Sequence, residues 1–144
     1  MSIWQIIAIA SPILLALYLL ITDYIDLFPY NDVSKHTEDD RKKERLNYIL
    51  PLISALASAF GYIITDLIAL ITAGIYLYGH IQWWWIPYFW GTTTERKQRY
   101  QKKFGHTLKV LPAIKDHPIP NLEHMPVGLL IIIWFVSALG CLFV

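Results

Sequence analysis

The feature that most constrains the fold of this chain is an apolar block over residues 46–90. It contains no Lys, Arg or Glu, and only Asp66 and His80 carry side chains that ionise near neutral pH. A single helix of that length would extend roughly 65 Å, about twice the hydrocarbon thickness of a bilayer. The block therefore predicts two membrane spans folded back on each other, over residues 46–64 and 66–86.

Two further apolar stretches are long enough to cross a bilayer, residues 3–22 and residues 126–144. No basic segment precedes the first one, so we expect an uncleaved span rather than a secretory signal. With 56% hydrophobic and 16% charged residues, the chain is too apolar for a soluble domain, in which about a quarter of the residues are charged. The expected fold is an all-α integral membrane protein with four transmembrane helices in a single domain, residues 1–144.

The charged residues are concentrated in two polar segments between the spans, residues 23–45 and 91–125, which contain all twelve Lys and Arg residues. If residues 46–90 form a hairpin, both segments emerge on the same side, and the positive-inside rule places that side in the cytoplasm. We therefore expect both termini outside, in the plasma (inner) membrane. The first segment is expected to extend the next helix, and the second to form an amphipathic helix and a Pro-rich loop. Together they would form a small cytoplasmic cap.

Asp66 is the only acidic residue in the apolar block. A carboxylate at the centre of a bilayer costs on the order of 3 kcal/mol on insertion scales. One interpretation therefore places it at the hinge beside Thr65, as a helix cap in water. The alternative moves the turn to Gly61 or Gly74, so that Asp66 binds a proton or an ion in an oligomeric channel or transporter.

Several residues in the polar segments are candidates for chemistry. The densest cluster of potential metal ligands contains Asp116, His117 and His124, but its spacing matches no established metal motif. No cofactor is therefore predicted, and a divalent metal is the alternative. Asp23 and Asp26 are three residues apart on one helix face, where oxygen ligands can hold a divalent cation against a lipid phosphate. An enzyme acting on lipid headgroups would use Asp23, Asp26, His117, Glu123 and His124.

The basic helix of the second polar segment, and the aromatic run before it, indicate contact with membrane lipid. Trp and Tyr are enriched at bilayer interfaces, and each Lys or Arg near an anionic surface contributes about 1 kcal/mol. The expected partners are anionic headgroups and not nucleic acid, because the net charge is only +1. The residues expected to contact headgroups are Arg96, Arg99, Lys103, Trp84 and Trp85.

Small residues in the apolar block predict close helix packing, with Ala57, Gly61 and Gly74 at the contacts. Such contacts also suit a homo-oligomer or a larger membrane complex. Cys141 is the only cysteine, which excludes an internal disulfide or dithiol relay. No motif identifies a function or decides whether the protein is an enzyme. An accessory or interaction subunit is the simplest hypothesis, and the alternatives are the headgroup enzyme and the channel.

Overall fold

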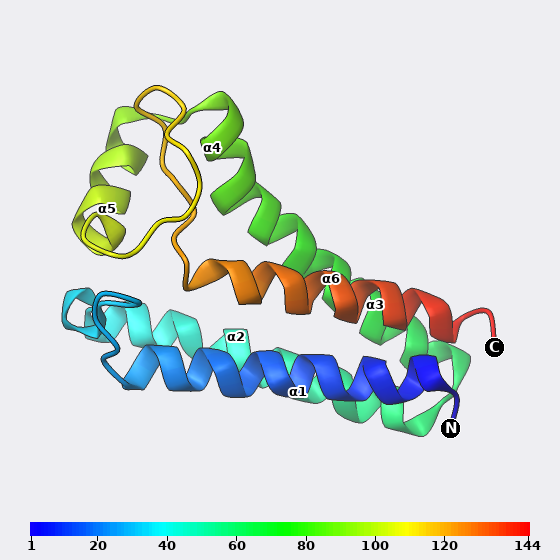
Figure 1. Ribbon diagram of the computed structural model, residues 1–144. Helices are drawn as coiled ribbons and strands as arrows, with labels where there is room; N and C mark the ends of the chain where they lie inside the picture. Colours follow the sequence, from blue (N-terminus) through cyan, green and yellow to red (C-terminus); the bar gives the residue numbers. More distant parts are fainter.

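The computed structural model describes residues 1–144, and it is helical throughout, without strands. Three stretches are long and apolar enough to cross a membrane: Ile3–Tyr24, Ile63–Trp90 and His124–Cys141. The helices are α1 (Ile3–Tyr24), α2 (Glu38–Phe60), α3 (Ile63–His80), α4 (Ile86–Trp90), α5 (Thr94–Phe104) and α6 (His124–Cys141). Figure 1 shows α1, α2 and α6 running side by side, with α3 packed against α2 and α6.

The chain places its apolar turn and its polar segments at opposite ends of the bundle. Both termini and the turn between α2 and α3 lie at one end in Figure 1, and the two polar segments lie at the other. We call this second end, formed by residues 25–45 and 91–123, the polar end. The predicted hairpin, with both polar segments on one side of it, is therefore present in the fold.

The position of the hairpin turn differs from the prediction. Helix α2 ends at Phe60 because Gly61 adopts a left-handed conformation (φ 65°), which favours glycine and ends helices. Helix α3 then begins at Ile63, where the Thr65 hydroxyl accepts a hydrogen bond from the backbone N–H of Tyr62 (3.1 Å). The turn is thus at Gly61 and Tyr62, and the prediction of a hinge beside Thr65 is wrong by about one helical turn.

The early end of α2 shortens the predicted span over residues 46–64. The helix extends back to Glu38, because Thr37 and Asp40 form a reciprocal cap: Asp40 N–H donates to Thr37 Oγ1 (3.2 Å) and Thr37 N–H to Asp40 Oδ2 (3.0 Å). Its apolar part, residues 46–60, is only about 22 Å long, shorter than the roughly 30 Å hydrocarbon core. By length and composition, three helices are therefore candidate membrane spans, and α2 is not one of them.

The other predicted spans correspond to longer or shifted helices. The span predicted over residues 66–86 is part of a continuous helix, Ile63–Trp90, in which a π-helical turn at Ile81–Trp85 joins α3 to α4. The last span begins at His124 and ends at Cys141, somewhat earlier than predicted at both ends.

The core lies where α1, α3 and α6 meet. Trp134 of α6 is fully buried there against Leu15 and Ala73, and its ring centroid is 5.3 Å from that of Tyr76. Small side chains allow the helices of the bundle to approach closely, and the buried ones in α2 and α3 are Ser54, Ala55, Ser58, Ala69 and Ala73. Of the predicted packing residues, Ala57 and Gly74 are half-buried, while Gly61 is exposed and serves the turn.

Candidate functional site at the polar end

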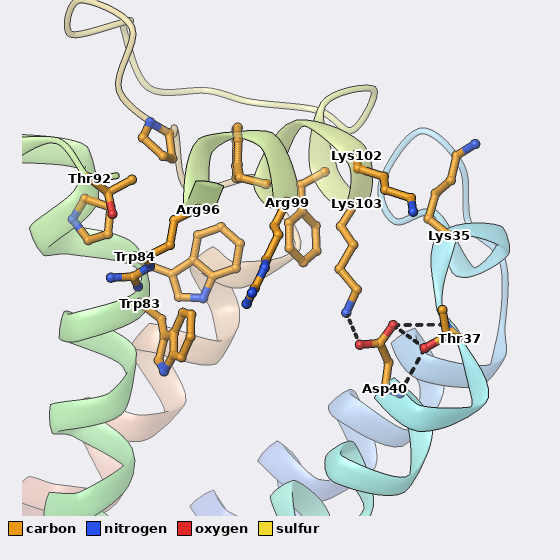
Figure 2. Close-up of a pocket in the computed structure, with 14 residues that line it drawn as sticks. Lys35, Thr37, Asp40, Trp83, Trp84, Thr92, Arg96, Arg99, Lys102 and Lys103 are labelled. Atoms are coloured by element: carbon orange, nitrogen blue, oxygen red, sulfur yellow. Dashed lines mark hydrogen bonds and ion pairs between the residues drawn. The ribbon is translucent and has the colours of Figure 1, made fainter. Parts of the chain in front are cut away.

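A cavity of about 530 Å³ lies beneath α5, between the end of the long helix Ile63–Trp90 and the start of α2. Trp83 and Trp84 form one wall, and Asp40 and the loop before α2 form the other (Figure 2). The side chain of Lys103 extends from α5 toward Asp40. The cavity falls in the volume range of small-molecule sites, roughly 300–1,000 Å³.

The cavity has an excess of positive charge. Five cationic side chains line it, from α5 and from the loop before α2: Lys35, Arg96, Arg99, Lys102 and Lys103. Two of them have carboxylate partners, because Lys103 pairs with Asp40 (3.0 Å) and Arg99 with Glu95 (2.6 Å). Lys35, Arg96 and Lys102 form no such pair. A concave surface of this sign attracts anions.

Asp40 is the only acidic residue lining the cavity, and its carboxylate already contacts Thr37 and Lys103. Partial burial raises its pKa, but hydrogen bonds from Thr37 and Lys103 outweigh that effect and lower the pKa to about 2. The carboxylate is therefore ionised at neutral pH, where it caps α2 and holds Lys103. It does not neutralise the remaining cations of the cavity.

Aromatic side chains support the basic helix from below. The Arg96 guanidinium lies 4.4 Å from the centroid of the Trp83 ring, in a cation–π arrangement. The Trp84 ring packs against Phe104 (5.1 Å between centroids) and Tyr100 (6.4 Å). Tyr100 and Phe104 of α5 thus pack on Trp84, and they line the cavity together with the basic side chains of that helix.

Four of the five residues predicted to contact headgroups line this cavity: Arg96, Arg99, Lys103 and Trp84. The fifth, Trp85, instead packs against Tyr88 and Phe89, with ring centroids 6.2 and 6.0 Å apart. Lys35, Lys102 and Trp83 also line the cavity but were not among the predicted contact residues. Lys35 belongs to the other polar segment, so only the tertiary fold brings it to the cavity.

A second cluster of polar side chains adjoins the cavity, and it combines Asp23, His36 and Glu44. One ligand atom from each lies within 4.8 Å of the other two. The separation between His36 Nδ1 and Glu44 Oε2 is 3.6 Å, and Lys103 Nζ lies 3.9 Å from Glu44 Oε1. The Glu44 carboxylate raises the pKa of His36, against the lowering effect of burial. His36 and Glu44 were not among the predicted site residues.

A buried hydrogen-bond network lies at the N-terminal end of α6. The Asn121 amide donates to Glu123 Oε2 (3.4 Å) and to Thr107 Oγ1 (3.1 Å), and its oxygen accepts from His124 Nδ1. Tyr18 of α1 donates to the Glu123 carbonyl (2.6 Å). Burial raises the pKa of Glu123 to about 7. These contacts tie the second polar segment to α1.

The fold does not bring the other predicted ligands together. Asp116 is exposed and pairs with Lys97 (2.6 Å), while His117 Nδ1 donates to the Tyr88 carbonyl (2.8 Å). His124 belongs to the Asn121 network, so Asp116, His117 and His124 form no three-ligand group. Of the predicted catalytic residues, Asp23 and Glu123 are buried at the polar end and His124 is beside Glu123. Asp26 is exposed, and His117 lies against Gly91.

Comparison with protein-family models, curated proteins and solved structures gives no match for this chain. Its function is therefore inferred from its own residues.

Asp66 lies far from this site, in the first turn of α3 at the opposite end of the bundle. Asp66 as a whole residue is 8% exposed, and its Oδ1 has no hydrogen-bond partner. The turn precedes it at Gly61, as the alternative interpretation required, and the side chain is not a solvated cap. Binding of a proton or an ion at Asp66 stays a prediction.

Proposed function

We propose that this chain is an integral membrane protein whose polar end binds the phosphate group of an anionic lipid in the cavity beneath α5. The observation that carries the proposal is the convergence of Lys35, Arg96 and Lys102 on one cavity without a carboxylate partner. Like charges gathered in this way repel one another, and an anion between them would relieve the repulsion. Guanidinium and ammonium groups are the common protein partners of phosphate.

A lipid fits this cavity better than a free anion does. Two tryptophans line one wall, and indole rings favour the level of lipid headgroups. The adjoining helices expose large apolar side chains, among them Leu56, Ile71 and Leu129, each at least 60% exposed. Acyl chains would lie along such surfaces while the cavity holds the headgroup. An exposed apolar surface of this extent indicates contact with lipid or with a protein partner.

The proposal includes a four-span topology with the polar end in the cytoplasm. All twelve Lys and Arg residues belong to the two segments that form this end, which the positive-inside rule assigns to the cytoplasm. Helix α2 would cross despite its short apolar part, because the flanking Lys42 and Arg45 can extend their charged groups to the interface.

The proposal is tested by measuring which lipid stays bound to the full chain. Native mass spectrometry of the protein, purified in detergent and mixed with phosphatidic acid, should show a bound lipid, and phosphatidylcholine should bind at least about tenfold more weakly. The variant Arg96→Gln/Lys102→Gln should lose the preference. The control Lys43→Gln/Lys115→Gln removes the same charge from side chains outside the cavity and should keep it.

Inorganic phosphate serves as the competing ligand in the same experiment. If millimolar phosphate displaces phosphatidic acid completely, the site binds the free anion and the lipid proposal is wrong. Equal binding of phosphatidylcholine, or equal loss in the two double variants, would contradict it as well.

An accessory subunit would hold the lipid without changing it, and this is the role we propose. The second candidate is an enzyme that acts on the headgroup, and the cluster of Asp23, His36 and Glu44 beside the cavity favours it. Incubation of the reconstituted protein with phosphatidic acid and phosphatidylglycerol separates the two. Unchanged lipid supports the accessory role, whereas headgroup turnover that Glu44→Gln abolishes supports the enzyme.

A further inference from the structure

We propose that Asp23, His36 and Glu44 form a binding site for a divalent transition-metal ion such as Zn²⁺. The three residues come from separate parts of the chain: the end of α1, the loop before α2, and the second turn of α2. The site rests on its own geometry and does not require that a lipid binds in the cavity. Of its three residues, only Asp23 was among the cation ligands expected from the sequence, where it was paired with Asp26; Asp116, His117 and His124 take no part in it.

The spacing of the three side chains suits a small cation. Their ligand atoms lie within 4.8 Å of one another, and His36 Nδ1 is 3.6 Å from Glu44 Oε2. Two ligands of a tetrahedral zinc ion with bonds of about 2.1 Å are roughly 3.4 Å apart. A cation between these two atoms would therefore need little movement of either side chain, and Asp23 closes the third side.

Buried atoms without hydrogen-bond partners point into the same space. The His36 side chain is only 8% exposed, and its Nδ1 has no hydrogen-bond partner. Glu44 Oε2 is also buried without a hydrogen bond, and Asp23 as a whole is 9% exposed. Buried polar groups in proteins are almost always paired. The two atoms face each other at 3.6 Å, too far apart for a hydrogen bond, and a metal ion held by His36, Glu44 and Asp23 would bind both at once.

The charge of the cluster favours a divalent ion. Metal binding would displace the proton that Glu44 favours on His36, and the two carboxylates with the neutral imidazole then carry a charge of −2. Nitrogen with oxygen ligands suits zinc and its first-row neighbours. Three protein ligands would leave a coordination position open, as in catalytic zinc sites. Lys103 lies 3.9 Å from Glu44 Oε1, which leaves Oε2 on the side of His36. Lys103 would thus orient the Glu44 carboxylate from outside the metal site.

The test is a Zn²⁺ titration of the full chain in detergent micelles, after chelator treatment and without added lipid. We expect one high-affinity Zn²⁺ per chain, measured by competition with a chromophoric indicator. Asp23→Asn, His36→Gln and Glu44→Gln should each weaken binding at least about tenfold, since even outer contacts of metal sites contribute 10–100-fold. The controls are Asp26→Asn, Glu38→Gln and His106→Gln, which change exposed residues of the same types and should bind as the wild type does.

A spectroscopic readout keeps the test decisive if a variant does not fold. Co²⁺ added to the wild-type protein in place of Zn²⁺ should give the intense visible absorption of a low-coordinate site, and excess Zn²⁺ should abolish it. A spectrum like that of aqueous Co²⁺, no stoichiometric Zn²⁺, or equal weakening in the controls would overturn the proposal. The variant Arg96→Gln/Lys102→Gln should keep the metal, so failure of lipid binding and failure of metal binding are distinguishable.

Discussion

Lys103 of α5 and Asp40 of α2 form an ion pair, with 3.0 Å between Nζ and Oδ1. The two residues belong to the two polar segments, which the whole apolar block separates in the sequence. Both side chains are about a quarter exposed (27% and 26%), and the same Asp40 carboxylate caps α2 through Thr37. This pair holds the basic helix over the start of α2, and so keeps the cavity closed on that side.

The coupling between Lys103 and Asp40 should be measurable in a double-mutant cycle. Using Lys103→Gln, Asp40→Asn and the double variant, we expect a coupling energy of about 1 kcal/mol in denaturant unfolding, because the pair is partly shielded from water. The control is the exposed pair of Lys43 and Asp39, 2.7 Å apart with side chains about three quarters exposed. It should couple by less than about 0.5 kcal/mol. Equal coupling in the two cycles would contradict this role of the pair.

Replacement of Gly61 should destabilise the turn between α2 and α3. Gly61→Ala places a Cβ at positive φ, and that Cβ would lie 2.8 Å from Gln5 Nε2. We expect a loss of about 1 kcal/mol or more in the free energy of unfolding, from the left-handed backbone alone. Gly79→Ala is the matched control, since no heavy atom lies within 4 Å of its added Cβ and its backbone is helical. A neutral Gly61→Ala variant would show that the turn is not fixed by this residue.

The stability of the fold should fall as the pH rises through neutrality, because of Glu123. Burial raises its pKa from 4.5 to about 7, so between these values the folded protein binds more protons than the unfolded chain does. The contribution is fully present below pH 4.5 and is lost as the pH passes 7, by up to about 3 kcal/mol. Denaturant unfolding at a series of pH values measures this loss.

The Glu123→Gln variant isolates that effect from other titrating groups. Glutamine resembles the protonated acid, so the variant should be less sensitive to pH between 4.5 and 7.5 than the wild type. Glu95→Gln changes an exposed glutamate of α5 and should keep the wild-type slope. Identical slopes for the wild type and Glu123→Gln would show that Glu123 is not the responsible group.

The sequence predicted the helical fold, the hairpin and the shared side of the two polar segments, because long apolar runs and segregated charges have few solutions in a bilayer. Arg96, Arg99 and Lys103, three of the five cations that line the cavity, were predicted as headgroup contacts, because they recur at helical spacing on one face. The site of the hairpin turn was predicted wrongly, since a hydroxyl and a carboxylate at Thr65 and Asp66 resemble a cap. Gly61 was assigned to packing, although its backbone conformation ends α2.

Contacts that depend on tertiary structure could not be predicted from the sequence. His36 and Asp23 are separated by an irregular loop, and only the packing of α2 on α1 brings Glu44 beside them. The loop after α5 shows the opposite case, since Asp116, His117 and His124 are close in sequence but engage different partners. Closeness in the sequence of this Pro-rich segment therefore predicted a cluster of metal ligands that the fold does not form.

The most direct test of a single polar end is the sidedness of two introduced cysteines. Glu38→Cys and Gln98→Cys, each in a Cys141→Ser background, place a thiol at an exposed position of each polar segment. In sealed vesicles of one orientation, a membrane-impermeant maleimide should label both from the same side. Labelling of the two positions from opposite sides would contradict the hairpin, the shared cavity and the cytoplasmic site together.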